Sequence, residues 1–167
     1  MMVKMSDGIG KIVEGYNSVI SALVNDRVIE IIVLEKNIDT KKIKDLIKIA
    51  QQKNVEVKNI KSKNEWKFTS TEYVAAICVP KTIYSESDLK KFDETNFIVC
   101  DHIQDTNNLG AIARSAASFD FNVMCVPERR SARLSERTFK ISSGGLEKID
   151  IFCLLYTSDA ADDIPRG

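Results

Sequence analysis

The chain of 167 residues has few of the side chains from which metal centres and disulfide frameworks are built, with one histidine and four cysteines. No two cysteines form a CxxC pair, and most of them lie in short apolar segments. This pattern is typical of buried, reduced thiols in a cytoplasmic protein. We therefore expect neither a metal site nor a disulfide.

The chain also lacks a long apolar run. No segment approaches the roughly 20 apolar residues that a membrane-spanning helix needs, and the first residues contain no apolar core of a secretory signal. An apolar content of 44% excludes a fully disordered chain. The sequence thus predicts a cytoplasmic globular protein of the α/β class, with no membrane segment.

Net charge is absent too, since 24 basic side chains balance 24 acidic ones, but the charges are unevenly distributed. Residues 41–67 hold nine lysines and three acidic residues. Such a region is typical of a surface that attracts nucleic acid, and equally typical of a solvated helix face. Trp66 and Phe68 are able to stack a nucleic-acid base there, although we favour a place for them in a small core.

Apolar spacing in the first half predicts alternating helices and strands. The helices cover residues 16–24 and 40–52, and the strands cover 28–34, 55–60 and 73–79. Together these elements define a small domain that we place at residues 12–80. The polar segment 81–95 follows a proline and holds at most one short helix, so we expect a linker there.

The pattern restarts over residues 96–153. It predicts strands over 96–100, 122–126 and 148–153, a first helix over 109–119 and a second helix before the last strand. This order implies a parallel sheet with right-handed crossovers, but one that is short of helices to cover both faces. Residues 154–167 have no lysine and resemble translated sequencing-adapter DNA. We expect this tail to be non-native and the natural chain to continue; a genuine acidic tail is the alternative.

A polar loop and a helix rich in small residues follow the strand that ends at Cys100. Ligands of open parallel sheets bind outside the carboxyl ends of the strands, where this loop falls. Asn108 is placed to cap the helix, and Arg114 lies within two turns of the loop, within reach of a phosphate or carboxylate. The structural alternative makes Asp105 and Asn108 turn and cap residues and extends Arg114 into solvent.

The segment 101–116, D-x-x-x-D-x-x-N-L-G-A-x-x-R-S-A, closely resembles the first conserved motif of the SpoU (TrmH) family of SPOUT RNA methyltransferases. Residues 130–134 and 140–147 resemble the segment after the family's second strand, and residues 14–19 resemble the opening of its substrate-binding domain. The resemblance covers about residues 12–153. It is nearest to the RlmB type, which methylates guanosine in 23S rRNA.

This resemblance implies an enzyme that transfers a methyl group from S-adenosylmethionine to a ribose 2′-hydroxyl of RNA. It also implies a small L30e-like domain that holds the RNA, a parallel α/β sheet ending in a deep trefoil knot, and a homodimer. By matching position, Asn108 and Arg114 are the catalytic residues, with Arg114 orienting or activating the attacking hydroxyl. Such help is needed because a ribose hydroxyl is a weak nucleophile.

Basic residues after the second strand of the parallel sheet complete the predicted site. Arg130, Arg133 and Arg137 are spaced i, i+3 and i+7, so one helix would carry all three on a single face towards RNA phosphates. The alternative is a solvated helix start. From these residues and the resembling segments, we assign Arg130, Arg133 and Lys140 to RNA binding.

The chain departs from the family pattern at three places. Thr106 replaces a proline, and Glu72-Tyr73-Val74 stands where the family often has His-Gln-Gly. The family's second and third motifs, a Gly/Glu-rich loop and a Leu-Asn-Val helix that form the knot and the cofactor pocket, are absent. We therefore expect no cofactor-binding residue in this chain and no methyl transfer by the chain alone. The alternative function is that of a non-catalytic RNA-binding module.

Overall fold

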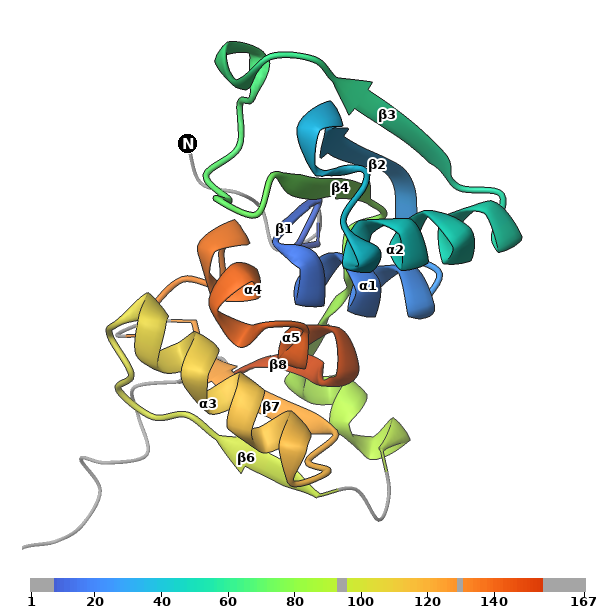
Figure 1. Ribbon diagram of the computed structural model, residues 1–167. Coiled ribbons are helices and arrows are strands. Elements are labelled where there is room, and N and C mark those ends of the chain that lie inside the picture. Colours follow the sequence, from blue (N-terminus) through green and yellow to red (C-terminus); the bar gives the residue numbers. More distant parts are fainter. Residues whose placement is uncertain (1–7, 93–95, 129–130, 155–167) are drawn as a thin grey trace, which may run out of the picture.

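Two four-stranded sheets organise the chain in a computed structural model that describes residues 8–92, 96–128 and 131–154 (Figure 1). The sheet of the first half has the order β1-β4-β2-β3, in which β2 and β3 are parallel and the other pairs antiparallel. Both helices of this half lie on one face of the sheet and touch each other. The elements are β1 (Ile12–Glu14), α1 (Tyr16–Val24), β2 (Val28–Leu34), η2 (Glu35–Asn37), α2 (Lys41–Gln52), β3 (Glu56–Ile60), η3 (Lys63–Glu65) and β4 (Val74–Cys78).

The helices of the first half form where the apolar period predicts them. In α2, the side chains of Ile43, Leu46 and Ala50 make a buried stripe, while the lysines cover the other face. A stripe at this spacing packs a helix against a sheet and stabilises it more than helix propensity does. Thr40 occupies the N-cap position of α2, although its side chain makes no capping hydrogen bond.

The second half contains the predicted parallel sheet. Its order is β5-β8-β7-β6, and every neighbouring pair of strands is parallel. The α/β class and the parallel sheet are therefore confirmed. The elements are β5 (Ile83–Ser85), η4 (Glu86–Lys91), β6 (Phe97–Val99), α3 (Thr106–Ser118), β7 (Val123–Pro127), α4 (Glu136–Ser142), α5 (Gly145–Lys148) and β8 (Asp150–Leu154). Of the expected tail, only Leu154 belongs to the described residues, where it ends β8.

The segment 81–95 is more than the linker that its polar sequence suggests. Ile83–Ser85 forms the edge strand β5, which pairs with β8 in the register Ile83↔Ile151. The apolar side of the following 3-10 helix η4 also packs on the sheet, through Leu89. The physical reason is that the three-residue strand β5 is stabilised by hydrogen bonds to β8, which lies far along the chain. The local sequence pattern therefore does not predict it.

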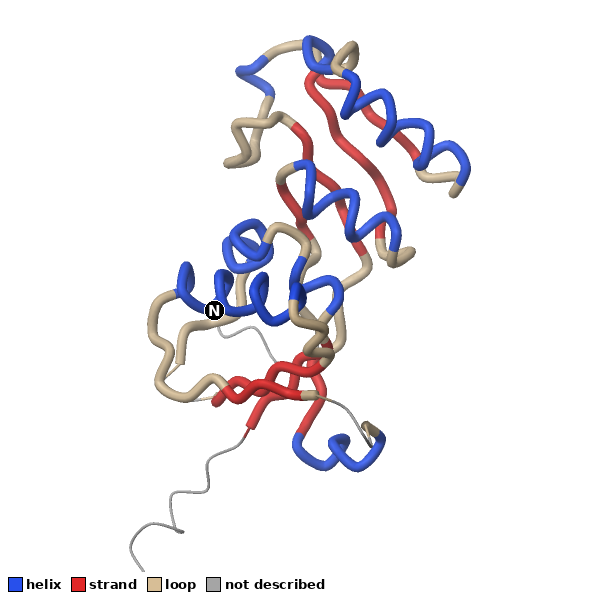
Figure 2. The backbone as a smooth tube through the Cα atoms, turned by 60° about the horizontal axis from the view of Figure 1, so that its bottom comes forward, coloured by secondary structure: helices blue, strands red, loops and turns tan. Residues whose placement is uncertain are grey.

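The two faces of the second sheet are covered unequally. Figure 2 shows α3, α4 and α5 as one layer between the two sheets, with η4 on the opposite side of the second sheet. One core cluster of buried side chains runs through both halves, whereas a small cluster around Phe152 lies under η4. At the edge strand β6, Phe97 remains 60% exposed and Val99 50% exposed. The expected shortage of covering helices is thus present among the described residues.

The start of α3 differs from the expected cap. Asp105, and not Asn108, is the N-cap residue, and its carboxylate accepts hydrogen bonds from the backbone N–H groups of Asn107 and Asn108. The helix therefore begins at Thr106, three residues earlier than its apolar pattern indicates. A carboxylate at this position also interacts favourably with the positive end of the helix dipole.

All four cysteines are buried and unpaired, which confirms the expectation for the thiols. Burial raises the pKa of Cys78 to about 12 and that of Cys100 to about 11, so these thiols stay protonated near neutral pH. Within the described parts of the chain, no group of three or more metal-ligating side chains gathers. No helix in those parts is long and apolar enough to cross a bilayer.

Close contact between α3 and α4 depends on Gly110. A Cβ atom at this position would lie 2.8 Å from the Cβ of Ile141 and 3.1 Å from the backbone oxygen of Thr138. We predict that Gly110→Ala lowers the free energy of unfolding by about 1–3 kcal/mol, because the two helices must separate. Chemical denaturation measures the change.

The matched control on the same helix is Ser115→Ala, at an exposed position. Alanine has the higher helix propensity, so this control should be neutral or stabilising by about 0.5 kcal/mol. Stabilisation by Gly110→Ala, as propensity alone would give, contradicts the packing account.

Candidate functional site

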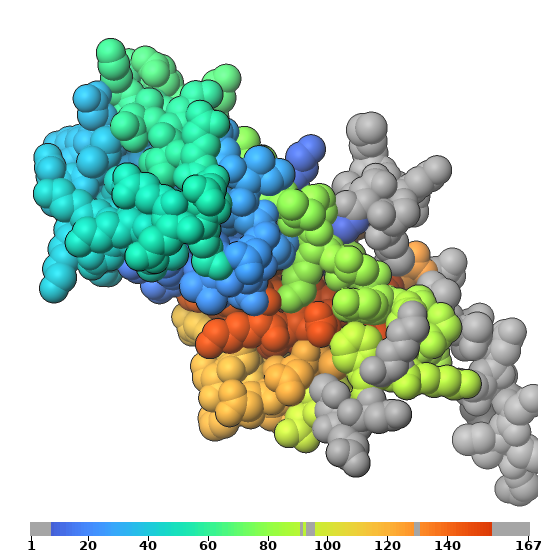
Figure 3. Space-filling model, turned by 90° about the vertical axis from the view of Figure 1, so that its right-hand side faces the viewer, coloured from blue at the N-terminus to red at the C-terminus, as the bar shows by residue number. Residues whose placement is uncertain are grey.

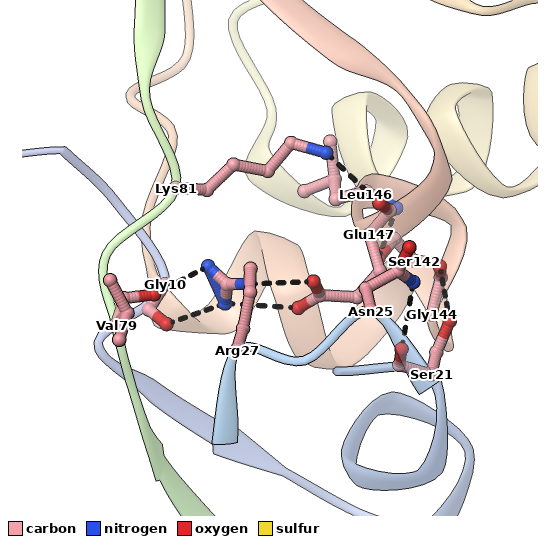
Figure 4. Close-up of polar contacts among 10 residues, drawn as sticks. All are labelled: Gly10, Ser21, Asn25, Arg27, Val79, Lys81, Ser142, Gly144, Leu146 and Glu147. Atoms are coloured by element: carbon pink, nitrogen blue, oxygen red, sulfur yellow. Dashed lines mark hydrogen bonds and ion pairs between the residues drawn. The ribbon is translucent and has the colours of Figure 1, made fainter. Parts of the chain in front are cut away.

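A buried ion pair joins the two halves. Arg27, directly before β2, donates from Nε to one carboxylate oxygen of Glu147 at 2.9 Å and from Nη2 to the other at 3.1 Å (Figure 4). The side chain of Arg27 is 12% exposed and that of Glu147 is not exposed at all. The same guanidinium group donates to the backbone oxygens of Val79 and Gly10. A bidentate contact of this kind fixes both the distance and the relative orientation of the guanidinium and carboxylate groups.

Further polar contacts surround the ion pair. Lys81 donates to the backbone oxygen of Glu147 at 3.0 Å, and the Ser21 hydroxyl of α1 donates to that of Gly144 at 3.2 Å (Figure 4). Deeper inside, the hydroxyl of Ser18 donates to the backbone oxygen of Phe139 at 3.3 Å. Together with the shared core cluster, these contacts hold α1 against α4 and α5.

The electrostatics of this contact are set by burial. Loss of water raises the pKa of the Glu147 carboxyl above its usual value, although the charges of Arg27 and Lys81 act in the opposite direction. Burial also lowers the pKa of Lys81, against the attraction of Asp150 and Glu147. The interior tolerates Arg27 and Glu147 because each charge has a partner of opposite sign. If one of them is removed, the other remains as a buried charge without a counter-charge, which lowers the stability of the fold.

The two residues predicted to be catalytic both lie on α3 but do not meet. Asn108 is exposed in the first turn, beside the loop at the carboxyl end of β6. Arg114 is exposed on the part of α3 that faces α1 and α5. They are six positions apart on the helix, which places them about 9 Å apart along its axis and about 120° apart around it. Their shared catalytic role stays a prediction.

The basic residues after β7 do not share a helix face, contrary to their spacing. The hydroxyl of Ser135 caps α4, so the helix begins at Glu136 and carries only the last of the three arginines, Arg137. Arg133 precedes the helix and is exposed, and Arg130 lies outside the described residues. The expected common face is therefore wrong, because the cap sets the helix start after Arg133.

Lys140 has a structural contact that the sequence does not suggest. Its ammonium group donates to the hydroxyl of Thr69 at 3.0 Å and lies 3.7 Å from the carboxylate of Glu14. The lysine thus adds a second polar link between α4 and the first half. Binding of RNA by Arg133 and Lys140 stays a prediction.

The aromatic residues of the first half pack among themselves. Trp66 stands edge-on to Phe68, with ring centres 5.0 Å apart, and to Tyr73 at 5.6 Å. Its indole N–H donates to the backbone oxygen of Ser70 at 3.1 Å. These contacts favour the interpretation of Trp66 and Phe68 as a small core beside β4 over a base-stacking platform.

A cavity of about 760 Å³ opens at the carboxyl ends of β7 and β8, where a ligand of a parallel sheet is expected. Three of its polar lining residues have partners within the chain. Ser131 bonds the backbone oxygen of Ile103, Ser135 caps α4, and Arg137 donates to the side chain of Asn107. Lys11, Glu128, Arg133 and Glu136 also line the cavity, so the described residues provide space at this edge together with side chains of both charges.

Two family models match the chain, one for each half. Residues 12–80 match the model described as RNA 2′-O ribose methyltransferase substrate binding, and residues 95–166 match that of the SpoU rRNA Methylase family. Among curated proteins, a TrmH family tRNA/rRNA methyltransferase of Staphylococcus epidermidis is 24% identical over 160 residues, which are 92% of this chain and 64% of that protein. The 23S rRNA (guanosine-2′-O-)-methyltransferase RlmB of Acinetobacter baylyi is 28% identical over 131 residues, 74% of this chain and 52% of that protein.

Solved structures share the fold. The SpoU methyltransferase AviRb of Streptomyces viridochromogenes, in complex with AdoMet, superposes with a TM-score of 0.66 at 15% identity over 88% of this chain and 55% of that chain. An AdoMet-bound rRNA methyltransferase of Sinorhizobium meliloti gives 0.64 at 17% identity, over 89% of this chain and 55% of that chain. This chain thus spans between half and two thirds of the length of the proteins that it matches.

Sequence reasoning missed Arg27 and Glu147, the best-defined polar contact of the structure. They lie 120 residues apart, and neither neighbourhood contains a charge pattern that suggests a partner. The one sequence sign is that Glu147 ends the segment 140–147, which resembles the family.

We predict that Arg27→Met lowers the free energy of unfolding by about 3 kcal/mol at neutral pH, because it leaves Glu147 buried without a counter-charge. The carboxyl pKa then rises further, so the folded state binds a proton that the unfolded state releases, and stability falls as the pH rises through that window. The deficit should shrink below about pH 4.5, the usual Glu value, where both states are protonated. Denaturation at several pH values measures it.

Two controls bracket this prediction. The double variant Arg27→Met with Glu147→Leu removes both charges and should recover most of the stability. Lys53→Met breaks the exposed pair with Asp26 and should cost at most about 1 kcal/mol. A loss in Arg27→Met that does not change with pH contradicts the role given to the Glu147 charge.

Proposed function

Since this chain belongs to the SpoU family of RNA methyltransferases, we propose that its protein transfers a methyl group from S-adenosylmethionine to a ribose 2′-hydroxyl, with guanosine of 23S rRNA as the substrate. The observation that carries the proposal is that the first half matches the substrate-binding model and the second half matches the methylase model. We further propose that the protein is a cytoplasmic homodimer.

The chemistry requires that a weak nucleophile lose its proton while it attacks the methyl group. The guanidinium group of Arg114 offers hydrogen-bond donors and no acceptor. It is suited to donate hydrogen bonds to the 2′-oxygen and to stabilise the negative charge that develops there. The Asn108 amide, which both donates and accepts, is suited to orient the ribose. S-Adenosylmethionine supplies the electrophilic methyl group when it is bound.

The first half is proposed to supply RNA affinity. Three lysines of the region 41–67 pair with carboxylates, namely Lys44, Lys53 and Lys58. The remaining lysines of that region form no ion pair within the described residues and leave positive charge on the surface. Unpaired lysines of this kind bind RNA phosphates with an affinity that falls with salt.

Mass spectrometry of ribonucleosides after incubation with S-adenosylmethionine and 23S rRNA tests the proposed reaction. We expect 2′-O-methylguanosine from the gene product extended past the codon for Cys153, and none from residues 1–167. Arg114→Ala in the extended protein should lower turnover by about 10²–10³-fold. Ser115→Ala, its exposed neighbour, is the control and should leave turnover unchanged. Methylation by residues 1–167 alone contradicts the second expectation, and its absence from the extended protein contradicts the first.

Self-association through the exposed edge of the second sheet distinguishes this proposal from its alternative. A stand-alone RNA-binding module should be monomeric. We predict that the 167-residue chain self-associates through Phe97 and Val99, and that Phe97→Thr with Val99→Thr reduces light scattering. Ile29→Thr is the control, since Ile29 is 57% exposed and lies on β2 of the other sheet. A monomeric wild-type chain favours the module.

A further inference from the structure

A polar cleft of about 380 Å³ lies between α1 of the first half and α3 and α5 of the second. Its polar side chains come from both halves: Asn17, Ser21 and Asn25 on the first, and Arg114, Ser118, Ser142, Ser143 and Lys148 on the second. Figure 3 shows the chain near residue 145, in red-orange, between the blue surface of the first half and the orange surface of α3. Of these side chains, the family motif assigns a role to Arg114 alone.

The cleft exists because three helices approach closely at one point. A Cβ atom on Gly145 would lie 2.8 Å from the Cα of Arg114 and 2.9 Å from the backbone oxygen of Ala113, so α5 runs in contact with α3. The hydrogen bond from Ser21 to Gly144 holds α1 over the same point. The buried Arg27–Glu147 pair, on the same α5, fixes the arrangement. Arg114 is thereby brought against the half that matches a substrate-binding domain.

The charge in the cleft is unbalanced. Neither Arg114 nor Lys148 makes a side-chain hydrogen bond or ion pair with any residue that the structure describes. No aspartate or glutamate is among the residues that line the cleft. The amide of Asn25 already donates to the backbone oxygen of Ser21, whereas no such bond engages the side chain of Asn17. Two unpaired cations beside a free amide favour a ligand with a single compact negative charge.

We propose that the polar cleft binds a backbone phosphate of RNA, with Lys148 and Arg114 as the cationic contacts and Asn17 as an amide donor. The proposal rests on the proposed function and adds the contact that places the RNA between the two halves. A phosphodiester fits because guanidinium and ammonium groups are its usual partners, and the cleft also offers hydroxyl and amide groups.

Fluorescence anisotropy of a short labelled single-stranded RNA, titrated with the 167-residue chain at several salt concentrations, tests the proposal. Lys148→Gln should weaken binding roughly five- to tenfold and make the slope of log affinity against log salt shallower by about 0.7. Asn17→Asp places a carboxylate in the cleft from the first half and should also weaken binding. Lys90→Gln, an exposed lysine on η4 across the second sheet, is the matched control and should change neither quantity.

A DNA oligonucleotide of the same sequence identifies the group that is bound. Contact with phosphate predicts that Lys148→Gln weakens the binding of DNA and RNA by the same factor, and a loss confined to RNA contradicts it. An unchanged affinity, an unchanged salt slope or a chain that does not bind RNA also overturns the proposal. Because the readout is binding and not methyl transfer, failure of the proposed reaction is distinguishable from failure of the cleft.

Discussion

The contact between Arg27 and Glu147 decides where the two halves of this protein lie. A buried charge pair is costly unless its hydrogen-bonding groups find partners. Here the carboxylate receives two bonds from one guanidinium group, which also reaches backbone oxygens at the end of β4 and near the N-terminal side of β1. One arginine therefore ties together the first sheet, the connection between the halves and helix α5. The relative position of the two sheets depends on this geometry.

The layer of helices between the sheets follows from the same contact. Helices α4 and α5 pack on α3 on one side and on α1 and β1 on the other, so one core serves both halves. The opposite face of the parallel sheet has only η4, and β6 is left with an apolar edge. The result is asymmetric: three helices cover one face of the second sheet, whereas the other face has only η4 and the β6 edge presents exposed apolar side chains.

Local pattern predicted much of this fold, and it failed where distant contacts decide. The strand β2 and the helix α1 have the bounds that their apolar spacing indicates, because their own side chains form the buried stripe. The edge strand β5 was missed, since its pairing partner lies far along the chain. Likewise, Asp105 caps α3 and Ser135 caps α4 at positions that apolar spacing does not reveal.

The candidate site shows the same division. Arg114 and Asn108 were found by motif, but only the fold shows that Arg114 lines a cleft shared with the first half. Lys148 and Asn17 come together only in the cleft that the packing creates, although Asn17 lies in the segment 14–19 that resembles the family. Residues that are brought together only by tertiary packing are the hardest to predict from the sequence.

Chemical denaturation with two probes tests most directly whether the ion pair makes one unit of the two halves. Trp66, the only tryptophan, reports on the first half by fluorescence, and far-ultraviolet circular dichroism reports on both halves. A single cooperative unit predicts coincident transitions with the same midpoint and slope. Separate transitions, with the fluorescence of Trp66 changing at its own denaturant concentration, would contradict the account.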